Sequence, residues 1–598
     1  MKYALSLLCS LFFVTVSHAQ QPIPANYQVK IDSLCNRVLK DQYVAGFAVA
    51  IVKGKQVVYS KGFGYRDVAN KKPVTPNTLF AIGSSTKAFT SGLIGKLQGE
   101  GKLSMDNKAT SYLPELQFFN DDMNNHITVR DLMCHRTGLS RYDLAWYVFN
   151  TANRDSLIKR VRYMEPSAPL RQKFQYNNFM FLAQGMIAEK LTGKTWEQNI
   201  KEKYFDPLEM KRSNTNIADL QKDTNASLPY EVYKDTIIKK MDYYNIDGMG
   251  PAGSINSSVN DMANWLKVWL NDGKYNGKEI LPGWYTNEAS SSQMVINGGR
   301  PTEKKDVFGA NYGLGWMIAS YRGHYRVEHG GNIDGFSASV AFYPTDSLGI
   351  VILTNQNVSA VTSIVRNSIC DILLNIPAVD WNGEKRRDID KAIKASSAKK
   401  KRTAKKQEKL NKPLRPLADY AGLYAAPAYG EIKVFAENDS LFATAGKFNF
   451  WLKHRHYDVF DILDMRDPGN TEDANRLNFL TGDNGRITGA NVSFGNEVPV
   501  LFKYRFKEVK LDTKQLEKYT GNYSDGVTTI KVHIKDTHLY MEVPDQGDME
   551  LTAAGNHNFA IKAMDDYFIK FEVSPKGYIT AITTLFPEKS ERIERKNK

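Results

Sequence analysis

The chain has 598 residues, of which 42% are hydrophobic and 24% charged, and a formal net charge of +14. This length exceeds that of one domain, and the composition excludes a disordered or collagen-like protein. The charge excess is concentrated in residues 385–412, which carry 13 Lys or Arg against three acidic residues without a nucleic-acid motif. We therefore expect a basic, solvated linker there, and neither a nucleic-acid partner nor membrane attachment.

The first residues have the pattern of a secretory leader. Lys2 precedes an apolar run from Ala4 to Val16, and a small-x-small cleavage site ends at Ala19. No later stretch reaches the roughly 18 apolar residues that a membrane-spanning helix needs. The pattern predicts an exported protein, periplasmic or extracellular, without a transmembrane segment.

The mature chain would keep three cysteines at wide spacings, which are Cys35, Cys134 and Cys370. An odd number at such spacings indicates neither a zinc site nor a disulfide framework, so we expect buried free thiols. The sequence leaves open whether Cys370 is paired.

After the leader, the apolar spacing predicts a helix and then a hairpin that turns at Gly54; these elements span 27–39, 47–52 and 56–60. A further apolar run, read as a strand, leads into a helix that begins at Ser84. The buried face of that helix should consist of every fourth residue, Phe89, Leu93 and Leu97. A helix and a hairpin before this segment suit a sheet with helices against its faces.

The start of this helix carries a serine and a lysine three residues apart, Ser84 and Lys87. Residues three apart share a helix face, so the lysine amine can reach the serine hydroxyl. A serine is a poor nucleophile unless a neighbouring base takes its proton, and a desolvated lysine can do so. The helix N-terminus also places positive dipole beside a developing oxyanion. The pattern alone is weak, because it recurs at Ser156, Ser396 and Ser397.

Downstream, Tyr176 and Asn178 precede an amphipathic helix over 179–191. In an extended segment, residues two apart point to one side. A tyrosine phenol can act as a general base or proton relay, and an asparagine amide can hold a substrate carbonyl or orient a lysine. The pattern recurs at 243–245, and the first copy is preferred because it enters a clean helix. His135, which ends a short helix before a glycine turn, is expected to be structural.

A glycine-rich turn at 248–253 is expected to border the pocket, and four strands are predicted beyond it, over 313–319, 324–328, 336–343 and 348–354. His329, Gly330 and Gly331 fall between the second and third of these strands. A glycine pair beside a strand lets a substrate approach the backbone closely.

The three motifs, which begin at Ser84, Tyr176 and His329, occur in one order. In this order they resemble the class C β-lactamase-like serine hydrolases of the penicillin-recognising superfamily, a group that also holds esterases, D-aminopeptidases and DD-peptidases. The resemblance covers roughly residues 25–378. It implies an α/β (α+β) two-lobed serine β-lactamase-like domain, in which an antiparallel sheet flanked by helices adjoins an all-α lobe, with the active site between the lobes.

The resemblance assigns a role to each matching residue. Ser84 is implied to be the acylated nucleophile, Lys87 its proton acceptor, and Tyr176 a second acid/base that serves the leaving group and later the attacking water. Asn178 is implied to orient the lysine or the substrate. Backbone N–H groups of Ser84 and Asn332 are implied to form the oxyanion hole. The substrate-binding strand is implied to comprise His329, Gly330, Gly331 and Asn332. No metal or organic cofactor is implied.

One departure from the family pattern changes the expected substrate. β-Lactamases and carboxypeptidases keep a lysine where this chain has His329. An imidazole, whose ordinary pKa is about 6.5, carries only a fraction of that positive charge at pH 7. Gly330 also lacks the hydroxyl that would bind the same substrate carboxylate. We therefore expect an esterase, an amidase or a D-amino-acid peptidase rather than an efficient β-lactamase.

A repeat lies beyond the basic linker. The segment around Tyr420 matches the segment around Tyr519, 99 residues later, and alternating strand patterns follow each copy. Two small all-β barrel-like domains are therefore predicted, and they resemble the lipocalin-like domains that follow some of these hydrolases. His454 and His456 lack an evident third metal ligand and are read as exposed strand residues. The predicted division is a leader at 1–19, the hydrolase domain at 20–383, the linker at 384–413, and β domains at 414–506 and 507–598.

Two functions remain open at this point. The first is an exported serine hydrolase that forms a Ser84 acyl-enzyme on a small ester, amide or peptide, cell-wall-derived substrates included. The alternative is a catalytically weak penicillin-binding or sensing module that recognises cell-envelope polymer through its β domains. The sequence leaves open the acyl donor, the role of the β domains and the oligomeric state.

Overall fold

The computed structural model describes residues 23–596 except for 302–305, 407–411, 467–473, 483–484, 494–498, 506–507, 556, 563, 565–566 and 587–589, so the predicted leader lies outside the described residues. The chain forms two compact units. The first comprises the residues up to Gly138 and from Pro166 to Lys394, and the second comprises Leu139–Glu165 and the chain from Ala395 onward. A segment inside the predicted hydrolase domain therefore clusters with the C-terminal β domains.

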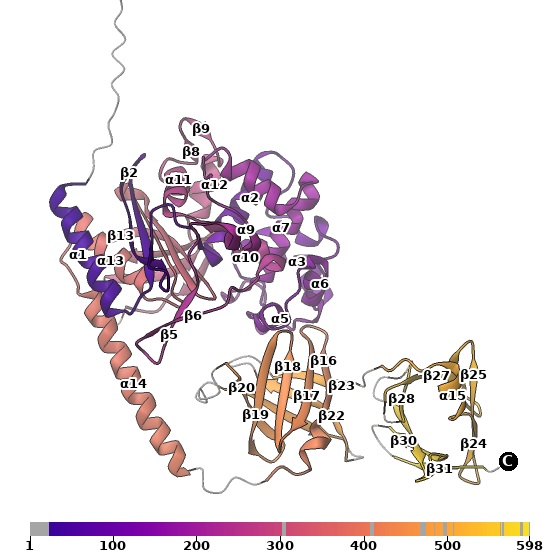
Figure 1. The fold of residues 1–598 in the computed structure, drawn as a ribbon. Helices are drawn as coiled ribbons and strands as arrows, with labels where there is room; N and C mark the ends of the chain where they lie inside the picture. Colours follow the sequence, from indigo (N-terminus) through magenta and orange to yellow (C-terminus); the bar gives the residue numbers. More distant parts are fainter. Residues whose placement is uncertain are drawn as a thin grey trace, which may run out of the picture. The chain divides into compact units, whose positions relative to one another are not determined.

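The first unit is built on a nine-stranded antiparallel sheet in the order β10-β11-β12-β13-β14-β15-β1-β2-β3 (Figure 1). Strands β1, β14 and β15 are buried along almost their whole length, as expected for strands covered on both faces. The strands are β1 (Gly46–Lys53), β2 (Gln56–Asp67), β3 (Lys72–Pro73), β10 (Met294–Asn297), β11 (Val307–Tyr312), β12 (Met317–Tyr321), β13 (His324–Ile333), β14 (Phe336–Tyr343) and β15 (Leu348–Thr354).

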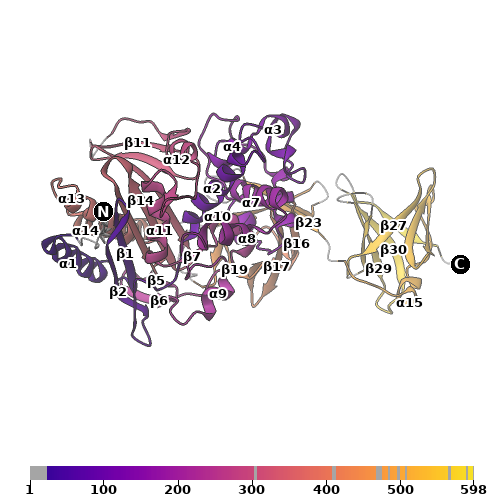
Figure 2. The same ribbon diagram turned by 90° about the horizontal axis from the view of Figure 1, so that it is seen from above.

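Helices cover both faces of this sheet, as Figure 2 shows. Helices α1 (Ala25–Asp41) and α13 (Val361–Leu373) pack on one face, where they share a core with Phe47, Val49 and Ile51 of β1. Helix α11 (Val259–Leu270) packs against β1 and β15. Alternate residues of β1 thus serve the α1 side, as the two-residue period of a strand requires. The predicted antiparallel sheet flanked by helices is confirmed.

The helical part of the first unit surrounds helix α2 (Lys87–Gly99), which packs against α7 (Phe179–Thr192). Phe89, Leu93 and Leu97 are fully buried, so the predicted apolar face is confirmed. Phe89 also stacks on Trp265 of α11, with ring centres 4.0 Å apart, which ties the helix to the sheet layer. Other helices here are α3 (Asp121–His126), α4 (Val129–Met133), α8 (Trp196–Ile200), α9 (Ile217–Lys222), α10 (Gly250–Gly253) and α12 (Gly283–Ala289).

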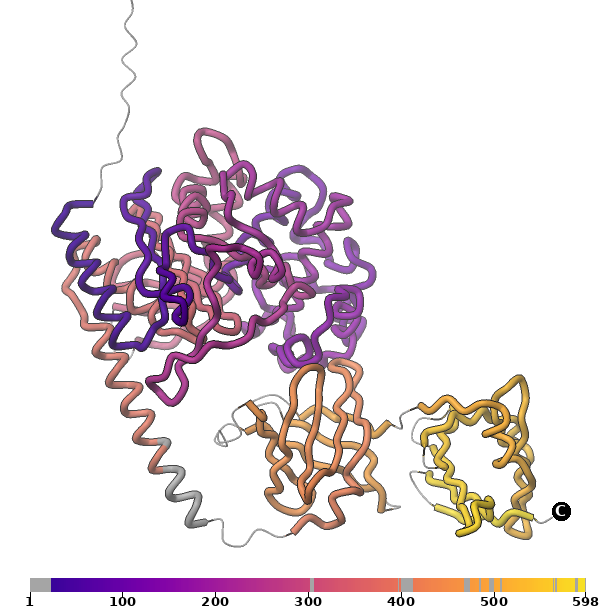
Figure 3. The backbone as a smooth tube through the Cα atoms, viewed as in Figure 1, coloured from indigo at the N-terminus to yellow at the C-terminus, as the bar shows by residue number. Residues whose placement is uncertain are grey.

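The C-terminal region forms two closed eight-stranded barrels, whose backbones Figure 3 traces. In the first, the Tyr424 hydroxyl donates to the Tyr420 carbonyl at 2.8 Å; in the second, Tyr523 donates to Tyr519 at the same distance. The predicted sequence repeat is therefore reflected in an equivalent tyrosine–carbonyl hydrogen bond in each barrel. The first barrel consists of β16 (Gly422–Ala426), β17 (Gly430–Glu437), β18 (Ser440–Ala445), β19 (Phe448–His456), β20 (Val459–Asp464), β21 (Asn475–Thr481), β22 (Ile487–Ser493) and β23 (Val500–Arg505). The second consists of β24 (Gly521–Ser524), β25 (Thr529–Lys535), β26 (His538–Val543), β27 (Gly547–Ala553), β28 (Asn558–Ile561), β29 (Phe568–Val573), β30 (Ile579–Leu585) and β31 (Arg592–Arg595), with α15 (Thr513–Glu517) before it.

Three local features differ from or refine the sequence analysis. Residues 329–331 lie inside β13 rather than between strands, and the strand predicted at 313–319 begins at Met317. Much of the predicted linker is helical, because α14 (Trp381–Lys406) continues through it. Cys35, Cys134 and Cys370 are buried free thiols, as predicted. Within the described residues, no helix has the length and apolarity to cross a membrane.

Candidate active site

The candidate nucleophile sits on a short turn between a strand and helix α2. Residues Gly83–Thr86 form a 3-10 turn, and Gly83 has a φ of +50°, which favours glycine. A Cβ atom at Gly83 would lie 2.8 Å from the Asn332 nitrogen, and one at Gly331 would lie 1.8 Å from the Ile82 carbonyl oxygen. Two glycines therefore allow strand β13 to pack directly against the turn that carries Ser84.

Lys87 is fully buried at the first position of α2. Its Nζ atom donates to Ser84 Oγ at 3.1 Å, to Asn178 Oδ1 at 2.7 Å and to the Ala252 carbonyl at 2.8 Å. The predicted Ser84–Lys87 pair is thus in hydrogen-bonding contact. The predicted Asn178 contact is also present, and Ala252 comes from the glycine-rich turn that was expected to border the pocket.

Tyr176 lies on the other side of the lysine. Lys87 Nζ is 4.8 Å from the centre of the Tyr176 ring. The Tyr176 ring packs on His135, with ring centres 4.3 Å apart, and His135 Nδ1 accepts a hydrogen bond from the Asn177 nitrogen at 3.1 Å. His135 therefore positions the Tyr176 segment, a structural role in line with the sequence reading. Asn178 is helical in φ and ψ rather than extended, yet its side chain still meets Lys87.

His329 lies in β13 and is only 1% exposed. Its Nδ1–H donates to the Gly330 carbonyl at 2.6 Å, and its Nε2 accepts from the Tyr312 hydroxyl at 3.0 Å. Burial, together with the nearby Lys87 charge, lowers the pKa of His329 to about 4. The imidazole is therefore neutral at pH 7. The backbone carbonyl oxygen of His329 accepts a hydrogen bond from Ser85 Oγ at 3.0 Å, which joins strand β13 to the turn that carries Ser84.

The carboxyl group of Glu328, next to His329 in the sequence, is paired with two arginines. Glu328 is hydrogen-bonded to Arg366 and lies 3.2 Å from Arg326. Burial opposes ionisation of this carboxyl, but the two arginines nevertheless hold the pKa of Glu328 below its usual value. Glu328 is therefore paired with arginines, one of them from α13, whereas the neutral His329 offers no cation to a substrate.

Asn332 contributes its backbone and its side chain to different tasks. Its Oδ1 accepts from Ser337 Oγ at 2.9 Å and from the Val358 nitrogen at 2.7 Å, so the side chain braces the turn between β13 and β14. The backbone of this residue is the part that lies against the turn of Gly83.

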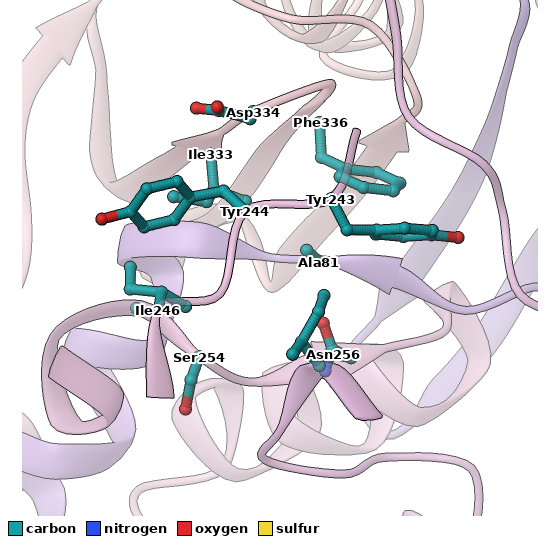
Figure 4. A pocket seen from close by; sticks show the side chains of 11 residues that line it. Ala81, Tyr243, Tyr244, Ile246, Ser254, Asn256, Ile333, Asp334 and Phe336 are labelled. Carbon is teal, nitrogen blue, oxygen red and sulfur yellow. The ribbon is translucent and has the colours of Figure 1, made fainter. Parts of the chain in front are cut away.

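A pocket adjoins the nucleophile turn on the side of the glycine-rich segment (Figure 4). A Cβ at Gly253 would lie 3.0 Å from Ile246 Cδ1 and 3.7 Å from the Gly83 carbonyl carbon, so the pocket wall reaches the turn. Tyr243 and Tyr244, from the second copy of the tyrosine–asparagine pattern, line this pocket. The lining residues are Ala81, Ile217, Tyr243, Tyr244, Ile246, Gly253, Ser254, Asn256, Ile333, Asp334 and Phe336.

Sequence reasoning missed Tyr312, because no local motif marks it. Its hydroxyl donates to His329 Nε2 and so favours the tautomer that carries the proton on Nδ1. The described residues hold one possible metal-binding group, His533, Glu542 and Asp548 of the second barrel. Glu542 and Asp548 are paired with Lys531 and Lys535, which is typical of a solvated surface cluster. His454 Nε2 faces the Tyr457 carbonyl at 2.9 Å.

Comparison with known proteins gives two family matches. The model described as "Beta-lactamase" matches residues 31–368, and a domain of unknown function, DUF3471, matches 406–510 and again 505–595. The two overlapping copies correspond to the two barrels.

Three similar proteins each share less than 30% sequence identity with this chain. Unguisins hydrolase ungD' of Aspergillus campestris is 28% identical over 418 residues, which cover 66% of this chain and 76% of that protein. Protein flp of Staphylococcus aureus is 27% identical over 343 residues, or 57% of this chain, and the match spans 65% of the relative, just under two thirds. The solved octameric penicillin-binding protein homologue from Pyrococcus abyssi aligns with a TM-score of 0.51 at 21% identity, covering 80% of this chain and 100% of that chain. This last likeness concerns the fold.

Proposed function

The chain belongs to the beta-lactamase family and is a serine hydrolase of that superfamily, and from this premise we propose that it acts through a covalent acyl-enzyme on Ser84. The observation that carries the proposal is the 3.1 Å contact between Lys87 Nζ and Ser84 Oγ. Asn178 and Ala252 hold the same amine from two other directions, so it is fixed beside the hydroxyl. A fixed base next to a serine supplies the activation that this nucleophile needs.

The proposed reaction has two halves. The three hydrogen bonds that Lys87 Nζ donates describe the protonated amine, so this amine must release one proton before it can act as the base. Ser84 Oγ then attacks the carbonyl carbon of an ester or amide while the neutral amine takes the hydroxyl proton. The negative charge that develops on the carbonyl oxygen would be stabilised by the backbone N–H groups of Ser84 and Asn332. As the bond to the leaving group breaks, a proton reaches that group through Tyr176. Water then attacks the acyl carbon and gives a proton to Tyr176 and Lys87. As the bond between the acyl carbon and Ser84 Oγ breaks, that proton passes to Oγ, which restores Ser84 and releases the carboxylic acid.

The substrate class follows from the neutral imidazole of His329. His329 is buried with a pKa of about 4, so it supplies no positive charge for a substrate carboxylate at pH 7. Gly330 supplies no hydroxyl. We therefore favour esters and amides without a free carboxylate near the scissile bond, in an esterase, amidase or D-amino-acid peptidase type of reaction. The name of the Aspergillus relative, an unguisins hydrolase, is consistent with a hydrolytic role.

Export is part of the proposal and depends on the leader pattern before Ala19. The alternative function, a sensing module that acylates but hardly turns over, differs from the proposal in its second half-reaction. A burst of acylation without continuing product release would favour that alternative.

The proposal is tested by hydrolysis of a short-chain p-nitrophenyl ester. Ser84→Ala should abolish turnover, because it removes the hydroxyl to which Lys87 Nζ is hydrogen-bonded. The matched control is Ser156→Ala, since Ser156 heads another copy of the same four-residue pattern and is exposed. Wild-type turnover in the Ser84 variant, or loss of turnover in the Ser156 variant alone, would overturn the assignment.

A further inference from the structure

The segment Leu139–Glu165 belongs to the same compact unit as the first barrel. It contains helices α5 (Leu144–Tyr147) and α6 (Arg154–Ile158). Its aromatic side chains pack on aromatic side chains of the barrel. The Tyr147 ring centre lies 5.5 Å from that of Phe448, and Phe149 lies 6.1 Å from Tyr429 and 6.0 Å from Phe502. Phe149 is 7% exposed, so these contacts bury it almost completely.

Two glycines of the barrel make room for this segment. A Cβ at Gly430, where φ is +142°, would lie 2.9 Å from Phe149 Cδ1. A Cβ at Gly446, where φ is +54°, would lie 2.3 Å from the Val148 carbonyl oxygen. Any other residue at either position would therefore force the segment away from the barrel.

The second barrel provides an internal comparison, because it repeats the first at an offset of 99 residues. The core pair is kept, since Tyr523 stands where the first barrel has Tyr424. The docking positions are not kept. Strand pairing aligns Ile432 with Ile530, because each lies opposite the core tyrosine, so Gly430 of the first barrel corresponds to Thr528 of the second. Phe448, opposite Ala445, corresponds to Gly547, opposite Val543, and the turn that holds Gly446 is replaced by Pro544, Asp545 and Gln546. The aromatic and glycine residues are thus particular to the barrel that holds the segment.

The other end of the segment leads into the active site through the polypeptide itself. The chain leaves the first unit after Gly138 and returns at Pro166. Just inside that unit, the Ser167 nitrogen donates to the Gly138 carbonyl at 2.9 Å, and the Gln175 nitrogen donates to the His135 carbonyl at 2.8 Å. The next residue after Gln175 is Tyr176. Residues 139–165 are therefore the tip of a loop whose two flanking segments are hydrogen-bonded to each other, and Tyr176 directly follows one of these segments.

We propose that the first barrel is a docking module for residues 139–165 and, through this loop, a positioning element for Tyr176. Phe149 makes the central contact, and Gly430 and Gly446 leave the space on the barrel that Phe149 and the Val148 carbonyl occupy. The inference rests on the proposed role of Tyr176 in the acyl-enzyme reaction. It also assigns this end of the first barrel to the chain's own segment rather than to a polymer ligand.

The test uses the full-length protein with Phe149→Ala, which removes the aromatic ring that packs on the barrel, and Gly430→Val, which fills the space beside that ring. The control is Thr528→Val, at the position of the second barrel that strand pairing matches to Gly430. Hydrogen–deuterium exchange of residues 139–165 should rise about tenfold in the first two variants and stay unchanged in the control. With a p-nitrophenyl ester, kcat should fall about fivefold or more with KM within about twofold of wild type, because positioning for the chemical steps is lost rather than binding. Phe149→Tyr, which keeps the ring, should restore kcat.

Two results would overturn the inference. If exchange rises and kcat does not change, the barrel does not position Tyr176. If exchange rises in neither variant, the segment does not depend on the barrel. Failure of the proposed function is distinguishable, because an acylating probe would then leave Ser84 of the wild-type protein unlabelled, whereas failure of this inference leaves that labelling intact. Thermal melting of each variant verifies that it is folded, and Gly430→Val serves if Phe149→Ala is not.

Discussion

Lys87 Nζ lies 2.7 Å from Asn178 Oδ1, and this hydrogen bond joins the first residue of α2 to the residue before α7. The amide is a neutral acceptor, so it holds the lysine without adding charge. Asn178→Asp would place a carboxylate there and stabilise the protonated amine, which cannot accept the serine proton. We expect the acylation rate to fall about 100-fold.

Rapid-mixing measurement of the acylation burst checks this expectation. Asn245→Asp is the matched control, because Asn245 ends the second copy of the pattern and is exposed. An acylation rate for Asn178→Asp equal to that of the control would contradict the role given to Asn178.

The glycine pair in β13 offers a second test with a built-in control. A methyl group at Gly331 would lie 1.8 Å from the Ile82 carbonyl oxygen, so Gly331→Ala must displace the nucleophile turn. At Gly330 the nearest atom, the Ala338 carbonyl oxygen, would be 3.5 Å away. We expect Gly331→Ala to lose about 100-fold in kcat/KM and about 1–3 kcal/mol of stability. Gly330→Ala should stay within about threefold of wild type. Equal activity of the two variants in an ester assay would show that the close approach is unimportant.

The buried imidazole makes stability depend on pH. The pKa of His329 is about 4 in the folded protein and 6.5 ordinarily, so between these values the unfolded chain binds a proton that the folded protein does not. The free energy of unfolding should therefore decrease as the pH falls below 6.5, by about 3 kcal/mol in total near pH 4. His329→Gln should remove this part of the slope.

Urea unfolding at pH 7 and pH 4.5 measures the effect. His126→Gln is the control, because the His126 side chain is 63% exposed. The same pH slope in wild type and His329→Gln would mean that the imidazole is not protected from protonation.

The pocket of Figure 4 leads to a prediction about substrate size. Ile246 lines it, and Ile246→Phe would fill part of its space beside Gly253. If the pocket receives a substituent of the substrate, kcat/KM for a bulky ester should fall about tenfold relative to the acetate ester. Ile237→Phe, at a site that is 51% exposed, should leave this ratio unchanged. A ratio unaltered by Ile246→Phe would place the substrate elsewhere.

The parts of the site that could be predicted are those that depend on local geometry. Ser84 and Lys87 meet because residues three apart lie on one side of a helical turn, although Ser84 lies in the 3-10 turn before α2 and not in the helix that was expected to begin there. The buried stripe of Phe89, Leu93 and Leu97 follows from the helical period. The central strands could be predicted from their continuous apolar runs. Their pairing into one antiparallel sheet follows from the family resemblance, and the structure confirms it.

The remaining features depend on contacts between distant parts of the chain. The neutral state of His329 is set by burial and by the Lys87 charge, and its tautomer by hydrogen bonds that include one from Tyr312 of β11, a partner that only sheet pairing brings near. Glycines usually mark the end of a strand, so 329–331 were placed outside one, whereas here they permit close packing within it. The packing of Phe149 on the first barrel could not be predicted, because the local sequence shows only a cluster of aromatic residues before Phe149 and nothing that indicates their partner.

The central claim is that Ser84 becomes covalently acylated, and peptide mass spectrometry after a fluorophosphonate probe tests it most directly. The account predicts one adduct, on the peptide that contains Ser84, and no adduct in Ser84→Ala under the same conditions. An adduct on Ser85 or Ser156 instead, or ester turnover that continues with Ser84 unmodified, would contradict the account.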